Sequence, residues 1–196
     1  MKKGGFGGGK TVTGLRFEER VNLLSKIAEV PGYEVRGNAI YYKSKLLAES
    51  YPKQKLYNIF LKERGVNYLD YVSKRYEPDE ALYVPEQNTM YIIEMKFQGG
   101  SGSVDEKIQT PDFKKRIYTK LFSPLKLNVE FIYVLSSFFN HPRLDDTFAY
   151  IKEVGCSYYF EELPLTALNF PTPTVTASTP LDTEDVIAKP EEVVSN

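Results

Sequence analysis

An apolar run at residues 127–136, LNVEFIYVLS, limits the possible folds more than any other segment of the chain. Strands that are buried on both faces have such near-continuous apolar sequences, whereas strands with one solvated face alternate apolar and polar residues. The run therefore predicts a central strand in a sheet whose two faces are both covered. Helical patterns lie on either side of it in the sequence, so we expect an α/β domain with a mixed central β-sheet flanked by helices.

Hydrophobic periodicity and turn residues predict the elements around this strand. In chain order we expect a helix over residues 14–29, a hairpin of strands 33–36 and 39–42, a helix over 52–65, strands near 80–84 and 90–97, helical residues over 104–122 with a break at Pro111, a helix over about 145–154 and a strand at 157–160. This order of helices and strands is typical of a mixed α/β protein, and no internal repeat is visible.

The two ends of the chain have compositions that are unsuited to a packed core. Residues 1–13 are rich in glycine, and residues 170–196 are rich in Pro, Thr, Ser and acids without any periodicity. We expect a Gly-rich arm, one domain over residues 14–169, and a flexible tail. Residues 4–11, GGFGGGKT, satisfy the P-loop pattern, but no strand leads into them and no helix follows directly, so we interpret the match as chance.

Composition excludes several kinds of site. His141 is the only histidine and Cys156 the only cysteine, which excludes zinc sites built from Cys and His as well as intramolecular disulfides. We expect His141 in a loop and Cys156 in the core. No apolar stretch is long enough to span a bilayer and no secretory signal is visible at the start, so we expect a cytoplasmic protein with no membrane association.

The formal net charge of −1 is unevenly distributed along the chain. Residues 171–196 contain five acids and one lysine, which leaves a charge of +3 on the rest of the chain. Residues 107–126 contain six basic residues and a single acid, Asp112. A phosphate backbone would be attracted to such a patch, although a solvated helix face explains the charges equally well. The lysines that we expect to contact DNA are Lys107, Lys114 and Lys115.

Polar side chains share one face of an otherwise apolar strand at residues 91–98, YIIEMKFQ. The period of two puts Glu94, Lys96 and Gln98 on the same face. A buried carboxylate and a buried ammonium need partners or an ion, and carboxylate oxygen is the ligand type that suits Mg²⁺. This face is therefore a candidate metal site. The alternative is a cross-strand salt bridge on a solvated sheet edge, because such alternation is common.

A second carboxylate precedes this strand in the sequence. If the strand that begins at Asp79 pairs antiparallel with residues 91–97, Asp79 lies beside Glu94 and Lys96. The two carboxylates could then share a metal ion that polarises a phosphodiester, while the lysine orients or helps to deprotonate the attacking water. The adjacent Glu80 points to the opposite face, and a one-residue change of register would select Glu80 in place of Asp79.

The loop over residues 99–103 has two interpretations. Ser101 and Ser103 could contact phosphate groups of DNA, while the loop glycines allow close approach of the backbone. Alternatively, the loop is an ordinary connection between a strand and a helix, capped by Ser103 or Asp105. The sequence favours neither interpretation.

The acidic residues and the lysine resemble the signature of the PD-(D/E)xK nuclease superfamily. Pro78-Asp79, fourteen intervening residues and Glu94-Met95-Lys96 match every position of that signature. The segments EMKFQGGSGSVDEKIQ and GLRFEERV are similar to segments of type II restriction endonucleases. The resemblance covers roughly residues 14–165 and implies a restriction-endonuclease-like fold.

The same resemblance implies roles for individual residues. Lys96 would assist the attacking water, and Glu18 from the first helix and Gln98 would complete the catalytic set. The residues implied to bind Mg²⁺ are Asp79, Glu94 and Met95.

The activity implied by the resemblance is sequence-specific hydrolysis of phosphodiester bonds in double-stranded DNA, leaving 5′-phosphate and 3′-hydroxyl ends. We expect a homodimer, because a two-fold pair of active sites is the simplest way to cut both strands of a symmetric site. A cognate DNA methyltransferase would accompany such an enzyme. Two alternatives remain: a structure-specific nuclease such as a Holliday junction resolvase, and a non-catalytic DNA-binding or interaction module on the same fold.

Overall fold

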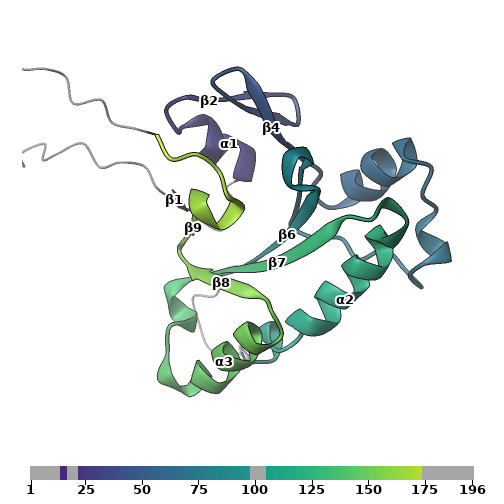
Figure 1. The fold of residues 1–196 in the computed structure, drawn as a ribbon. Coiled ribbons are helices and arrows are strands. Elements are labelled where there is room, and N and C mark those ends of the chain that lie inside the picture. Colours follow the sequence, from purple (N-terminus) through teal and green to yellow (C-terminus); the bar gives the residue numbers. More distant parts are fainter. Residues whose placement is uncertain (1–13, 17–21, 98–104, 174–196) are drawn as a thin grey trace, which may run out of the picture.

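The described part of the chain, residues 14–16, 22–97 and 105–173, is built of helices and strands in the computed structural model (Figure 1). The strands are β1 (Gly14–Arg16), β2 (Tyr33–Arg36), β3 (Ala39–Tyr42), β4 (Lys45–Ser50), β5 (Glu80–Val84), β6 (Thr89–Lys96), β7 (Asn128–Leu135), β8 (Ser157–Phe160) and β9 (Glu162–Pro164). The α-helices are α1 (Leu23–Ala28), α2 (Pro111–Phe122) and α3 (Asp145–Glu153). A further helix over residues 54–63 is π-helical at Leu56–Leu61. No helix in the described ranges is long and apolar enough to cross a bilayer.

Seven strands form one mixed sheet in the order β2-β3-β4-β5-β6-β7-β8, and β1 pairs with β9 in a separate two-stranded sheet. The strands from β2 to β6 are antiparallel to their neighbours, whereas β6, β7 and β8 are parallel. Parallel neighbours need a crossover connection, and helices supply it here. The connection from β6 to β7 contains α2, and that from β7 to β8 contains α3 (Figure 1).

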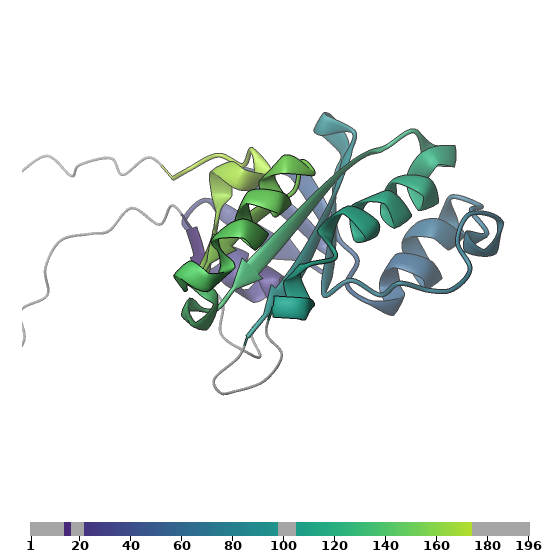
Figure 2. The same ribbon diagram turned by 90° about the horizontal axis from the view of Figure 1, so that it is seen from below.

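Both faces of β7 are covered, as its apolar sequence requires. Phe131 and Tyr133 belong to a core on the face covered by α2, α3 and the helix over residues 54–63. Ile132 and Val134 belong to a second core, on the face covered by α1 and the C-terminal end of the described chain. Figure 2 shows α2 and α3 lying together against one side of the sheet. Alternate residues of one strand therefore enter two different cores.

Most of the elements expected from the sequence are present. The hairpin of β2 and β3, the paired strands β5 and β6, the two helical pieces divided at Pro111, and α3 followed by β8 lie within two residues of their expected bounds. The strand expected at residues 127–136 is β7, which lies between β6 and β8. The expected mixed α/β class is confirmed.

The prediction of a helix over residues 14–29 is wrong for the first part of this range. The chain begins this region as β1, which pairs antiparallel with β9, and α1 starts only at Leu23. Asn22 has an extended backbone, and its side-chain oxygen accepts the N–H of Leu24 at 2.7 Å. This N-cap sets the beginning of the helix because it satisfies a backbone donor that has no partner inside the helix. Residues 17–21 lie outside the described part.

The strands β4 and β9 are not expected from the sequence. β4 follows β3 through Lys43-Ser44, whose φ angles are both positive, at 48° and 66°. Two-residue hairpin turns of this kind normally contain Asn-Gly or Asp-Gly, which tolerate positive φ at low cost. Lys-Ser gives no such signal, so periodicity and turn residues do not reveal β4.

The packed part of the chain extends beyond residue 169, where we expected the tail to begin. Phe170 is only 4% exposed and belongs to the core that contains α1. Its ring lies 6.2 Å from that of Tyr33, whose hydroxyl donates a hydrogen bond to the carbonyl of Pro171. The packed part of the domain therefore includes Phe170.

This packing predicts the effect of truncating the Phe170 side chain. Phe170→Ala should lower the free energy of unfolding by about 3 kcal/mol, because it removes a buried ring and leaves a cavity. Leu69→Ala is the matched control, since Leu69 is 60% exposed and its truncation should change stability by less than about 0.5 kcal/mol. Urea unfolding of the three proteins measures both effects. Equal stability of the wild type and Phe170→Ala would contradict this account.

Candidate active site

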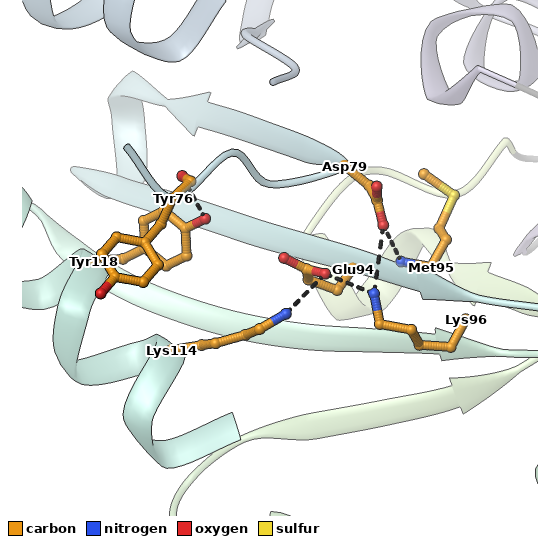
Figure 3. Close-up of polar contacts among 7 residues, drawn as sticks. All are labelled: Tyr76, Asp79, Glu94, Met95, Lys96, Lys114 and Tyr118. Atoms are coloured by element: carbon orange, nitrogen blue, oxygen red, sulfur yellow. Dashed lines mark hydrogen bonds and ion pairs between the residues drawn. The ribbon is translucent and has the colours of Figure 1, made fainter. Parts of the chain in front are cut away.

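The register between β5 and β6 places Asp79 beside Glu94. The last pair of this ladder is Glu80 opposite Ile93, so Asp79, one residue earlier, lies next to Glu94 on β6. The Oδ2 atom of Asp79 accepts a hydrogen bond of 2.9 Å from the backbone N–H of Met95. Figure 3 shows the Asp79 carboxylate held at the end of this ladder by that hydrogen bond.

Lys96 joins the two carboxylates. Its Nζ lies 2.8 Å from Oε2 of Glu94 and 3.9 Å from Oδ2 of Asp79 (Figure 3). Glu94 and Lys96 share a face of β6 because they are two residues apart. The expected convergence of two acids and an amine is therefore confirmed, and the roles of the three groups in catalysis remain predictions.

Glu94 lies deeper than its partners. Its side chain is 8% exposed, against 36% for that of Asp79. A buried carboxylate needs charged or hydrogen-bonding partners, and the expected Lys96 is joined by a second lysine. Lys114 of α2 places its Nζ 3.0 Å from the same Oε2 atom of Glu94. The site thus combines two carboxylates with two ammonium groups.

The position of Lys114 differs from the expected one. We expected Lys114 to contact DNA from a basic helix face, but the structure directs it toward Glu94 at the sheet. Helical spacing contains this signal, because Lys114 follows the buried Pro111 by three residues and precedes the buried Tyr118 by four. The charge of Lys114 alone does not reveal that it lies on this face.

Two tyrosines border the carboxylates. Tyr133 of β7 is directly opposite Glu94 in the parallel ladder, and the side chain of Thr110 lies near its hydroxyl. The hydroxyl of Tyr118 donates to the carbonyl of Tyr76 at 2.9 Å. Burial raises the pKa of both hydroxyls, and the negative charge of Glu94 raises it further. Both phenols are therefore neutral donors at physiological pH.

The oxygen atoms at this site fit Mg²⁺. Asp79 and Glu94 supply two carboxylates, and Mg²⁺ commonly takes one or two, with waters and substrate phosphate as its other ligands. The carbonyl of Met95 lies on the same side of β6 as its N–H, which is the side of Asp79. The Met95 side chain lies on the opposite face, so only its backbone could serve as the expected ligand. No third acid, histidine or cysteine among the described residues forms a metal-binding group with these two acids.

Asp79 and Glu80 lie on opposite faces of the sheet. Glu80 points to the face opposite Glu94 and is buried. Its Oε1 accepts hydrogen bonds from the hydroxyl of Ser50 at 2.9 Å and from the backbone N–H of Ala81 at 3.0 Å. Burial raises the pKa of Glu80 to about 7, against the lowering effect of these hydrogen bonds. Of these two acids, Asp79 is the one that shares a face with Glu94.

Of the other expected site residues, two lysines lie in the described part of the chain and the rest lie outside it. Lys107 is exposed. Lys115 makes structural contacts, since its Nζ donates to the carbonyl of Gly155 at 2.6 Å and lies 3.7 Å from Oε2 of Glu130. These contacts connect α2 to the turn before β8, and a DNA contact by either lysine stays a prediction. The expected residues that lie outside the described part of the chain are Glu18, Gln98, Ser101 and Ser103.

Comparison of the chain with protein-family models, with curated proteins and with solved structures gives no significant match. The site must therefore be interpreted from its own geometry and chemistry.

The raised pKa of Glu80 predicts a pH-dependent stability. The folded state holds the proton up to about pH 7, whereas the carboxyl of the unfolded chain loses it near 4.5. The stabilisation is therefore complete below pH 4.5 and is lost as the pH rises through 7, by about 3 kcal/mol in total. Glu80→Gln keeps a hydrogen-bond acceptor but cannot ionise. Urea unfolding at pH 5 and pH 8 should show this loss in the wild type and not in the variant, and parallel pH curves would contradict the assignment.

Proposed function

We propose that this protein is a Mg²⁺-dependent nuclease of the PD-(D/E)xK type that hydrolyses phosphodiester bonds in DNA. The observation that supports the proposal best is the convergence of Asp79, Glu94 and Lys96 from adjacent strands. A salt bridge on a solvated edge, the alternative for this strand, does not describe a carboxylate as buried as Glu94. The mixed sheet flanked by helices is compatible with the proposed restriction-endonuclease-like fold.

The exposure of the site residues suggests how a substrate would approach. Asp79 is the more open carboxylate and Glu94 the inner one. A metal ion bound to both would polarise the phosphate and stabilise the negative charge that develops on it. Lys96 contacts both acids, where its side chain would orient or help to deprotonate the attacking water. The hydrogen bond from the N–H of Met95 keeps the Asp79 carboxylate in place for the incoming phosphate.

The finer parts of the proposal concern the substrate and the assembly. We propose cleavage of double-stranded DNA at a specific short sequence by a homodimer, as in type II restriction endonucleases, with a cognate methyltransferase protecting the host DNA. The lysines at the site would attract the phosphate backbone irrespective of sequence, so specificity must come from contacts to base edges.

Digestion of supercoiled plasmid DNA with Mg²⁺, and with EDTA as the metal-free control, tests the proposal. Asp79→Asn, Glu94→Gln and Lys96→Ala should each lower the rate of cleavage by at least about 100-fold, because each removes a group that acts on the metal or the water. Glu80→Gln is the matched control for Asp79→Asn. It changes the neighbouring acid on the other face of the strand and should leave the rate unchanged.

The products distinguish the proposed activity from its alternatives. Discrete bands from a plasmid of known sequence support site-specific cleavage. Cleavage restricted to branched DNA supports a structure-specific nuclease such as a resolvase, and binding of DNA without cleavage supports a non-catalytic module. Cleavage that persists at the wild-type rate in Glu94→Gln would refute the assignment of the site.

A further inference from the structure

A single carboxylate oxygen binds both lysines of the site. The Nζ atoms of Lys96 and Lys114 lie 2.8 Å and 3.0 Å from Oε2 of Glu94. The lysines come from different elements, β6 and α2, and approach the carboxylate separately (Figure 3). One of them would be enough to form an ion pair with one carboxylate. The second positive charge therefore needs a further explanation.

The charges of the four described residues at the site balance one another. Asp79 and Glu94 contribute two negative charges, and the two ammonium groups contribute two positive ones. A divalent cation held by the two carboxylates would lie close to both ammonium groups, because these contact the same oxygen of Glu94. Repulsion between them is strong where little water screens it, as beside the buried Glu94. The cation and both lysines cannot all remain on this oxygen without a large electrostatic cost.

Lys114 is the lysine better placed to leave. Lys96 faces both acids, because its Nζ is also 3.9 Å from Asp79. The ion pair of Lys114 in the described part of the chain is with Glu94 alone. Its ammonium also lies 6.0 Å from the centre of the Phe131 ring, a weak attraction that does not depend on the carboxylate. If a cation displaced Lys114, Lys114 would lose the ion pair that it makes with Glu94, whereas Lys96 would keep its contact with Asp79.

We propose that Lys114 is an internal counter-ion that neutralises Glu94 in the metal-free protein and is displaced from it by a divalent cation. The displaced ammonium stays on α2, next to the carboxylates, where it can bind an oxygen of the substrate phosphate. Metal binding then releases one positive charge for the DNA. This inference rests on the proposed function insofar as it assumes that the two carboxylates bind a metal ion.

Binding of Mn²⁺ without DNA tests the inference independently of cleavage. Lys114→Met keeps a long side chain over Phe131 and removes the competing charge, so it should tighten Mn²⁺ binding by about tenfold or more in calorimetric or electron paramagnetic resonance titrations. Lys120→Met is the matched control, because it removes the same charge from an exposed position of the same helix. It should change the affinity by less than about twofold. Lys114→Gln serves in the same way if the methionine variant does not fold.

A double variant shows where the ion binds. Glu94→Gln added to Lys114→Met should abolish the tightened binding, because it removes the carboxylate for which the lysine and the ion compete. Tight Mn²⁺ binding that survives Glu94→Gln would overturn the inference.

The outcomes separate this inference from the proposed function. Equal or weaker Mn²⁺ affinity in Lys114→Met, together with normal DNA cleavage by the wild type, overturns the inference alone. Tightened affinity in a protein that cuts no DNA supports the inference and refutes the nuclease proposal. Failure of both the wild type and Lys114→Met to bind Mn²⁺ at millimolar concentration overturns both.

Discussion

The antiparallel ladder between β5 and β6 determines which side chains meet at the site. Its register sets which of two adjacent acids, Asp79 or Glu80, shares a face with Glu94. A slip by one residue would exchange them and would also move the apolar residues of β5 into the wrong core. Leu82 and Val84 pack with α1, while Ala81 packs with α2. The apolar alternation that stabilises the sheet therefore also selects the acid at the site.

Burial gives the site its electrostatic character. Glu94 lies beside a central strand and under a helix, where an unpaired carboxylate is costly. Ion pairs with Lys96 from the sheet and Lys114 from α2 offset this cost. The hydroxyls of Tyr118 and Tyr133 nearby remain neutral, because their pKa is raised. Among the described residues, these two lysines contact the Glu94 carboxylate directly, and the proposed displacement of Lys114 would replace one positive charge beside Glu94 by another.

The sequence predicts the parts of the fold that depend on local patterns. β6 and β7 follow from their apolar residues, and the convergence of Asp79 with Glu94 follows from one assumed pairing. The pairing of β1 with β9 joins segments far apart in the chain, and no local pattern identifies such partners. Helical spacing places Lys114 on the buried face of α2, but it does not identify Glu94 of β6 as the partner of Lys114. Glu18 and Gln98 lie outside the described residues.

The segment that leads into β5 is held from two sides. Tyr57, in the π-helical stretch, and Tyr118 of α2 both donate hydrogen bonds to the carbonyl of Tyr76, three residues before Asp79. Glu94 is instead part of a strand with hydrogen-bonded neighbours on both sides. The two acids are therefore positioned by different contacts. A change in the packing of either helix would shift Asp79 relative to Glu94 even if the pairing of β6 with its neighbours stayed intact, so the distance between the carboxylates depends on helices that carry neither of them.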